Sequence, residues 1–224
     1  MTHQLRVALE LGPKGKKVVA LAPDWPGLVR GAGTEDAALA KLQSYLPRYA
    51  PVAKLADRER EFAASTHIEI VERYEGVGST DFWGISFAFS SFDRQTMSDQ
   101  ELERELSLMQ ACWRYFDDVR SRVTAELKKG PRGGGRDRDH IVRHTVVAEM
   151  EWARKLGLRM PESVTLTDGV VNAHRTAYTR AIRAFHGEGK MARTWPLRFL
   201  IRHTAYHTLD HAWEMEDKDL THVS

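Results

Sequence analysis

Cysteine is almost missing from this sequence, which has one, Cys112, in 224 residues. A single cysteine excludes an internal disulfide and a thiolate cluster, so any bound metal would need histidine and carboxylate ligands. The sequence also has no run of about 18 apolar residues, and no basic segment followed by an apolar one near Met1. We therefore expect a soluble, cytoplasmic protein without a membrane span or a secretory signal.

A large excess of charge of either sign is also lacking. The chain has 33 lysines and arginines against 31 aspartates and glutamates, which gives a formal net charge of +2. Binding to a phosphate backbone usually needs a stronger basic excess, so the charge does not favour nucleic acid as a partner. With 42% hydrophobic residues, the chain is long enough for one large or two small globular domains.

The first part of the chain has the alternating pattern of β-strands. Apolar and polar side chains alternate over residues 5–11, and a second β-rich run covers residues 17–22. Residues 28–30 resume as a strand, residues 67–73 are expected to return to the same sheet, and residues 82–89 are a further strand candidate. The pattern indicates a small β-sheet in the N-terminal part.

A turn and a helix start lie among these strands. The segment Pro23-Asp24-Trp25-Pro26-Gly27 must bend the chain, because its two prolines fix φ and lack N–H donors. Thr34 is typical of a helix N-cap, and the helical pattern that follows it continues until Pro47 and Pro51. The order is therefore β-β-β-α.

This pattern resembles the HicB-type antitoxin module over about residues 4–55. The resemblance rests on the run 18–27, which ends in the Pro-Asp-x-Pro-Gly turn, and on Gly31, Thr34 and the acidic-alanine segment 35–37. It implies a small α/β module at residues 1–75, which in antitoxins covers a toxin. The chain has no helix-turn-helix or ribbon candidate for DNA binding, so for this module a scaffold or interaction role is supported at least as well as an antitoxin role.

After Ser98 the periodicity becomes helical. Ser98 and Glu101 form a capping box for a helix that runs to Lys128 and Lys129. Further helices are expected at about residues 138–156, 167–185 and 195–217, and four such helices joined by short loops describe a four-helix bundle. The fold class is thus α+β with two domains: a module at residues 1–75, a linker or additional strand at residues 76–97, and a bundle at residues 98–224.

Histidines recur at helical spacing in the bundle. His203, His207 and His211 stand at i, i+4 and i+8 on the last helix, and His140 and His144 have the same spacing on the second. A single such pair is more often incidental than metal-binding, but three in register and a pair on another helix favour a metal site. Nitrogen-rich ligation suits zinc, nickel, copper or iron.

A second resemblance, over about residues 98–217, is to the DinB-like four-helix bundle superfamily. It rests on His144 followed by Glu149 and Trp152, and on the run from His207 to Glu214. It implies a divalent metal (zinc, nickel or iron) held by His144, His207 and His211, with water at an open position. His140, His203, Asp210 and Glu214 are candidates for the surroundings of these ligands, and Glu214 is the preferred one because it lies three residues after His211.

The resemblance also implies a reaction. Its members include thiol-dependent transferases and isomerases, so the metal is expected to activate a low-molecular-weight thiol or water toward a small electrophile, in a transfer or a hydrolysis. Arg143, Arg198 and Arg202 are candidate substrate-binding groups. The alternative is a non-enzymatic stress or interaction protein, in which the HicB-like module mediates association. Homodimerisation through a helix face fits either case.

Overall fold

The N-terminal part of the molecule is a four-stranded sheet. In a computed structural model, which describes residues 3–130, 135–159 and 165–221, the strand order is β3-β2-β1-β4. The strands are β1 (His3–Leu11), β2 (Val18–Leu21), β3 (Val29–Ala32) and β4 (Ser65–Glu75). β1 pairs antiparallel with β2 and parallel with β4, which confirms that the fourth strand returns to the same sheet.

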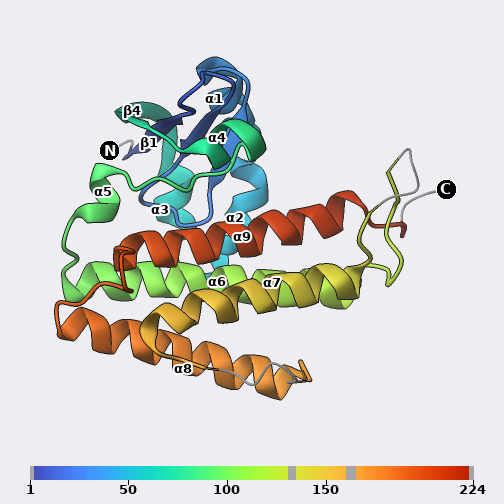
Figure 1. The fold of residues 1–224 in the computed structure, drawn as a ribbon. Helices are drawn as coiled ribbons and strands as arrows, with labels where there is room; N and C mark the ends of the chain where they lie inside the picture. Colours follow the sequence, from blue (N-terminus) through green and yellow to red (C-terminus); the bar gives the residue numbers. More distant parts are fainter. Residues whose placement is uncertain (1–2, 131–134, 160–164, 222–224) are drawn as a thin grey trace.

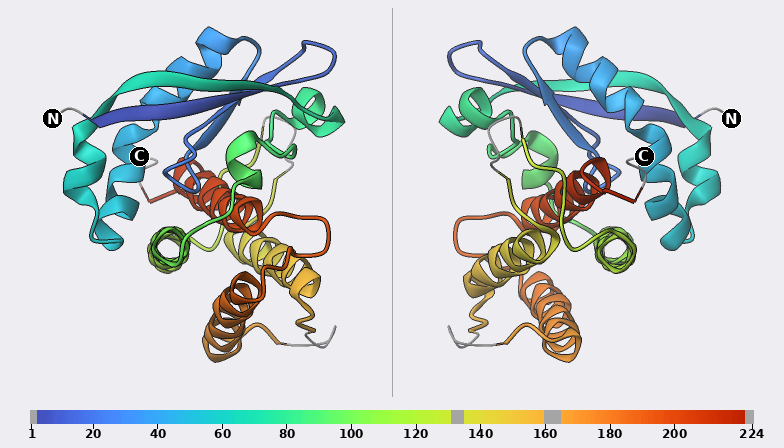
Figure 2. Two further views of the ribbon diagram at one scale, coloured as in Figure 1. Left: turned by 90° about the vertical axis from the view of Figure 1, so that its left-hand side faces the viewer. Right: turned by 90° about the vertical axis from the view of Figure 1, so that its right-hand side faces the viewer.

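Three helices connect β3 to β4 and cover one face of the sheet: α1 (Glu35–Ser44), α2 (Leu46–Leu55) and α3 (Glu59–Ala64) (Figure 2). Thr34 caps α1 as expected, because its side chain accepts a hydrogen bond from the backbone N–H of Ala37. The expectation that helical structure ends at Pro47 and Pro51 is wrong. Pro47 stands in the first turn of α2, where a missing N–H costs nothing, and Pro51 lies inside the same helix.

The segment between the sheet and the long helices is not a strand. The prediction of a strand over residues 82–89 is wrong: the chain forms α4 (Gly78–Trp83), an irregular stretch and α5 (Ser91–Arg94). The physical reason is the buried carboxylate of Glu10 on β1, which accepts hydrogen bonds from the hydroxyls of Thr80 (2.5 Å) and Ser86 (2.6 Å). These bonds draw the segment across the sheet face, away from any edge at which it could pair.

Long helices form the rest of the molecule. They are α6 (Asp99–Arg122), α7 (Arg138–Ala153), which continues as the short 3-10 helix η1 (Arg154–Leu156), α8 (Asp168–Gly187) and α9 (Leu197–Asp217). The capping box of Ser98 and Glu101 is present. α6 ends before the expected Lys128. Just after its last residue, the backbone N–H of Thr124 donates to the carboxylate of Asp219 at 2.9 Å, and so does not continue the helical hydrogen-bond pattern.

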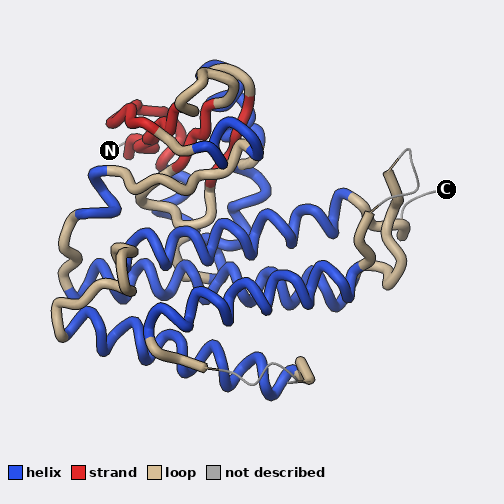
Figure 3. Tube along the Cα trace, viewed as in Figure 1, coloured by secondary structure: helices blue, strands red, loops and turns tan. Residues whose placement is uncertain are grey.

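α9 is the central element of the molecule. It runs between the sheet and the other long helices, while α8 lies farthest from the sheet (Figure 1; Figure 2). Strands are confined to one side of the molecule and helices make up the remainder (Figure 3). Sheet residues such as Leu5 and Val7, and helix residues such as Phe116 and Phe199, belong to one continuous buried cluster. The fold class is therefore α+β, as expected.

Within the described ranges, no helix combines the length and the apolar character that crossing a membrane requires.

Candidate metal centre

Three histidines meet where α7 packs against α9. His144 comes from α7, and His207 and His211 come from successive turns of α9. One ring nitrogen from each lies within 4.8 Å of the other two. The four-residue spacing places His207 and His211 on one face of α9, so the sequence pattern brings these side chains together as soon as the two helices pack.

The distances fit a tetrahedral metal ion. The Nε2 atoms of His207 and His211 are 3.2 Å apart. Two ligands at the usual Zn–N distance in a tetrahedral site stand about 3.3 Å from each other. The ring of His144 lies 5.1 Å from that of His207 and 4.9 Å from that of His211, between centroids. His211 is buried and His144 exposed, so the centre opens toward solvent on the α7 side.

Glu214 sets the tautomer of His211. Its Oε2 lies 2.7 Å from His211 Nδ1, so Nδ1–H donates to the carboxylate and Nε2 keeps its lone pair for a metal. Glu214 also pairs with Arg136 (3.0 Å) and Lys218 (2.6 Å). Partial burial opposes its ionisation, but the hydrogen bonds from His211 and Lys218 and the nearby charges lower the pKa of Glu214 to about 2.

The other two histidines are held neutral. Burial, together with the neighbouring histidines, lowers the pKa of His207 to about 2. Burial and His211 also lower the pKa of His144. A neutral imidazole has a lone pair to offer, whereas a protonated one has none. The donor set is nitrogen-rich, which suits zinc, nickel or iron better than magnesium or calcium.

Aromatic side chains wall the centre on the side of α9's first turns. Trp152 of α7 makes edge contacts with the rings of His203 and His207, at centroid distances of 4.7 and 5.0 Å. His203 is itself buried, beside Phe87 and Phe199. Its Nδ1 has no hydrogen-bond partner among the described residues, and burial lowers its pKa to about 3. His203 lies outside the three-histidine group and belongs to this wall.

The remaining polar candidates are spread around the molecule. His140 is exposed, one turn before His144 on α7, and Arg143 is exposed beside it in sequence. Asp210 faces the sheet, where its carboxylate accepts a 2.8 Å hydrogen bond from Arg30 of β3. Of the two carboxylates considered for the surroundings of the ligands, Glu214 is thus the one that contacts a histidine.

Two of the candidate substrate-binding arginines are already occupied by carboxylates. Arg202 is 3% exposed and forms a bidentate pair with Asp93 (2.8 and 2.7 Å). Arg198 pairs with Glu105 at 2.8 Å. Arg202 therefore links α5 to α9 and has no face free for a substrate. The carboxylates that Arg202 and Arg198 contact are not the ones near the three histidines.

Sequence reasoning missed Arg136 and Lys218. Arg136 belongs to a Gly- and Arg-rich stretch that composition predicts to be solvated, and Lys218 follows the end of α9. Neither has a spacing signal toward the histidines. The one usable signal was the four-residue spacing from Glu214 to Lys218, which is typical of an ion pair on a helix.

Comparisons of this chain with protein-family models, with curated proteins and with solved structures find no match.

Proposed function

We propose that this protein is a metal-dependent enzyme whose centre is the group His144, His207 and His211. The metal is zinc, nickel or iron, and the reaction is the transfer of a low-molecular-weight thiol, or of water, to a small electrophilic substrate. The observation that carries the proposal is the convergence of three ring nitrogens within 4.8 Å, two of them at tetrahedral spacing. The sequence resemblance to the DinB-like bundles supports the same assignment.

Three protein ligands are typical of a catalytic metal, whereas structural sites usually have four. When bound, such a metal supplies a nucleophile by lowering the pKa of a coordinated water or thiol toward neutrality.

The side chains around the centre have separate tasks. Glu214 orients His211 and holds its proton on Nδ1. Trp152 and the buried His203 exclude water on the side of α9's first turns, while the exposed His144 leaves the group accessible to solvent. Such a division keeps solvent away from the back of the ligands and lets a substrate approach from the front.

The first test is the metal content of untagged protein by elemental analysis. We expect near-stoichiometric metal in the wild type and in the control variant His67→Ala, since His67 is an exposed histidine of β4. His144→Ala and His207→Gln should each lose most of it. Circular dichroism checks the fold, and His144→Ala is the safer variant because its side chain is exposed.

The second step is a search for thiol transfer to small electrophiles by the metal-loaded wild type. Loss of turnover in both variants would support the proposal. A wild type that takes up no zinc, nickel or iron would overturn it.

A second candidate, association without catalysis, is favoured by one observation. Phe82 and Trp83 at the end of α4 are 69% and 67% exposed and stack edge to face at 4.5 Å. Exposed aromatic pairs are uncommon on monomers. If this pair holds a second copy of the chain, Trp83→Ser will shift sedimentation from dimer to monomer and leave the metal content unchanged.

A further inference from the structure

Aromatic and basic side chains gather at the end of the sheet where β1 turns into β2. The turn and α4 lie side by side there (Figure 2). Phe82 and Trp83 of α4 are 69% and 67% exposed. The turn carries Lys14 and Lys16, which are exposed, and the half-buried Lys17. We call these five residues the lysine–aromatic surface.

Asp81 of α4 holds this surface together. Its carboxylate accepts hydrogen bonds from the backbone N–H groups of Lys14 (2.6 Å), Lys16 (2.8 Å) and Lys17 (3.3 Å). The ammonium group of Lys17 donates to the backbone oxygen of Phe82 at 3.1 Å. The backbone that carries the lysines and the aromatic rings is therefore preformed, so a partner does not have to order it on binding.

The lysines of this surface are not neutralised by neighbouring side chains. Among the described residues, none of the three forms a salt bridge, and Lys17 donates to a backbone oxygen. Asp81 is occupied by backbone N–H groups. Glu75 of β4 is paired in register with Leu11, which packs on the helix-covered face of the sheet, so Glu75 points away from α4. The surface therefore presents positive charge beside exposed aromatic rings.

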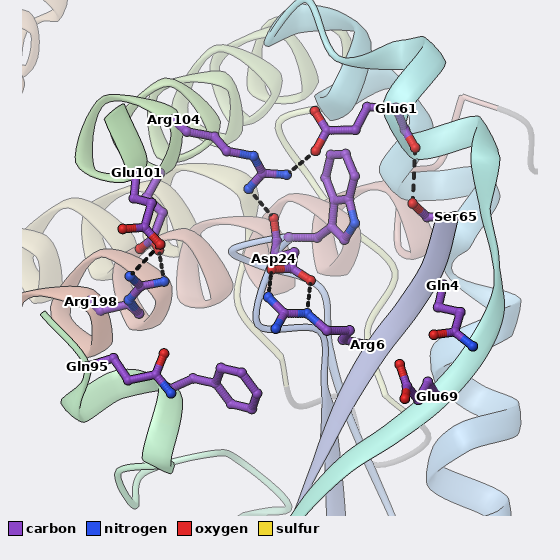
Figure 4. A pocket seen from close by; sticks show the side chains of 13 residues that line it. Gln4, Arg6, Asp24, Glu61, Ser65, Glu69, Gln95, Glu101, Arg104 and Arg198 are labelled. Atoms are coloured by element: carbon purple, nitrogen blue, oxygen red, sulfur yellow. Dashed lines mark hydrogen bonds and ion pairs between the residues drawn. The ribbon is translucent and has the colours of Figure 1, made fainter. Parts of the chain in front are cut away.

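The other charged region beside β1 has no such excess. It is a hollow of about 480 Å³ lined by the strands β1 and β4, α3, and the first turns of α6 and α9. Each arginine in its wall pairs with a carboxylate of the same wall: Arg6 with Asp24, Arg104 with Glu61, and Arg198 with Glu105 (Figure 4). No cation of that wall is left for a partner, which distinguishes it from the lysine–aromatic surface.

A lipid surface that contains anionic headgroups matches both halves of the lysine–aromatic surface. Tryptophan and other amphipathic aromatic side chains favour the interface between membrane and water. Phe82 and Trp83 contact each other edge to face at 4.5 Å, so they can enter this interface as one apolar group. The lysines beside them would be attracted by the negative surface potential of anionic lipids.

Two other occupants match this surface less well. A two-fold contact between two copies of the chain would bring the lysines of one copy close to those of the other. Single-stranded nucleic acid could stack on the rings, but it is usually bound by a longer basic groove that follows its backbone. Both occupants are separate outcomes of the experiment below.

We infer that the lysine–aromatic surface binds a membrane that contains anionic lipids, with Phe82 and Trp83 inserted at the interface and the lysines at the headgroups. The protein would then attach to the membrane without spanning it. This inference goes beyond the proposed function and does not depend on it, because the surface shares no residue with the histidine group.

The test is co-sedimentation of the full-length protein with vesicles of phosphatidylcholine, pure or mixed with about 30% phosphatidylserine. We expect the wild type to bind the mixed vesicles, to bind them less at high salt, and to bind the pure ones only weakly. Trp83→Ser should weaken binding at least about tenfold. Lys16→Gln should weaken it about fivefold. Both side chains are exposed, so neither substitution disturbs the core.

Tryptophan fluorescence reports insertion directly. Of the six tryptophans, Trp83 is the exposed one, and the others are buried or half-buried. Brominated acyl chains in the mixed vesicles should therefore quench part of the wild-type fluorescence. Trp83→Phe keeps an aromatic ring, so it should still bind the vesicles but lose this quenching.

Lys54→Gln and Leu55→Ser are the matched controls. Both residues are exposed at the end of α2, outside the lysine–aromatic surface, so each substitution should change binding by less than about twofold. The inference is overturned if the wild type does not bind the mixed vesicles, if the controls weaken binding as much as Lys16→Gln and Trp83→Ser, or if the quenching persists in Trp83→Phe.

Two further results would assign the surface to another partner and would also overturn the inference. A wild-type dimer that Trp83→Ser dissociates in sedimentation would assign the aromatic pair to a second copy of the chain. A single-stranded oligonucleotide that displaces the wild type from the vesicles, but binds Trp83→Ser poorly, would assign it to nucleic acid.

Discussion

At the scale of single residues, Glu214 is the side chain on which the histidine group depends most. It contacts His211 and two cations, Arg136 and Lys218, which keep it ionised. Asp210, one turn earlier on the same helix, has an equally short contact, but with Arg30 of the sheet. The two carboxylates therefore form a matched pair for experiments, one bound to a histidine and one bound to the sheet.

We predict that Glu214→Gln lowers metal affinity by about 10- to 100-fold, because an amide no longer holds the His211 proton as strongly as a carboxylate. Asp210→Asn should leave the affinity within about twofold of wild type. Competition with a chromophoric chelator measures both. Equal losses of affinity in the two variants would show that the negative charge near the histidines, and not the contact with His211, sets the metal affinity.

Glu149 on α7 gives a pH dependence of stability. It is buried, and burial raises its pKa to about 7 in the folded protein. In the unfolded chain its pKa is near the ordinary value of about 4.3, so the folded state binds the extra proton and stability falls as the pH rises between these values.

We predict that, from pH 5.5 to 8, the wild type loses about 2 kcal/mol of unfolding free energy relative to Glu149→Gln. Urea titrations at the two pH values measure this. Glu151→Gln, an exposed neighbour on α7, should follow the wild type. Parallel stability curves for wild type and Glu149→Gln would contradict the prediction.

The grouping of the three histidines could be predicted from sequence, and its surroundings in part. Spacing on two helices was sufficient to propose His144, His207 and His211, and i+3 spacing ranked Glu214 above Asp210. Arg136 could not be found, since it reaches Glu214 from a stretch without periodicity. The commitment of Arg202 to Asp93 was equally hidden, because 109 residues separate them in the chain.

At the scale of elements, the segment 84–98 is fixed to α9 by a buried ion pair. Arg202 and Asp93 are 3% and 2% exposed. Although burial opposes ionisation of Asp93, the charge and hydrogen bonds of Arg202 lower its pKa. Helix starts at Ser98 and Thr167 were predictable from their caps. The course of this segment was not, because the alternating pattern of residues 82–89 reflects contacts with Glu10 and α9 instead of a strand partner.

We predict that Arg202→Met destabilises the protein by about 3–5 kcal/mol, since it leaves Asp93 buried without its counter-ion. Arg183→Met removes a bidentate pair with Glu103 at the surface and should cost less than about 1 kcal/mol. Urea denaturation compares the two. A similar cost for both substitutions would mean that the Arg202 pair contributes no more than a surface pair.

At the scale of the whole molecule, the sheet and the long helices share their core. The turn that ends at Gly27 presses directly on α9: an added Cβ at Gly27 would lie 2.7 Å from Leu209 Cδ1, and φ at Gly27 is +98°. Across the same boundary, the guanidinium of Arg30 lies against the rings of Tyr45 and Trp213, 3.7 and 4.3 Å from their centroids. If either the sheet or the long helices lost their packing, buried side chains of the other would be exposed to solvent.

We predict a single cooperative unfolding transition, shared by β1 and α9 in hydrogen exchange. Gly27→Ala should lower the stability of both elements together by about 1–3 kcal/mol, because of the contact with Leu209 and the left-handed φ. Gly33→Ala, where an added Cβ meets nothing within 4 Å, should change stability by less than about 1 kcal/mol. Separate transitions for β1 and α9 would contradict the shared core.

The hydroxyl of Ser86 has a consequence for the order of folding. It donates to Glu10 at 2.6 Å and accepts from Arg202 at 2.9 Å, partners that lie 76 and 116 residues away in the chain. Contacts at such separations form late, after the loops between them have closed. Ser86→Ala should therefore speed unfolding and leave the folding rate nearly unchanged in stopped-flow measurements. The segment around Ser86 is then the last part of the molecule to reach its native position during folding and the first to detach during unfolding.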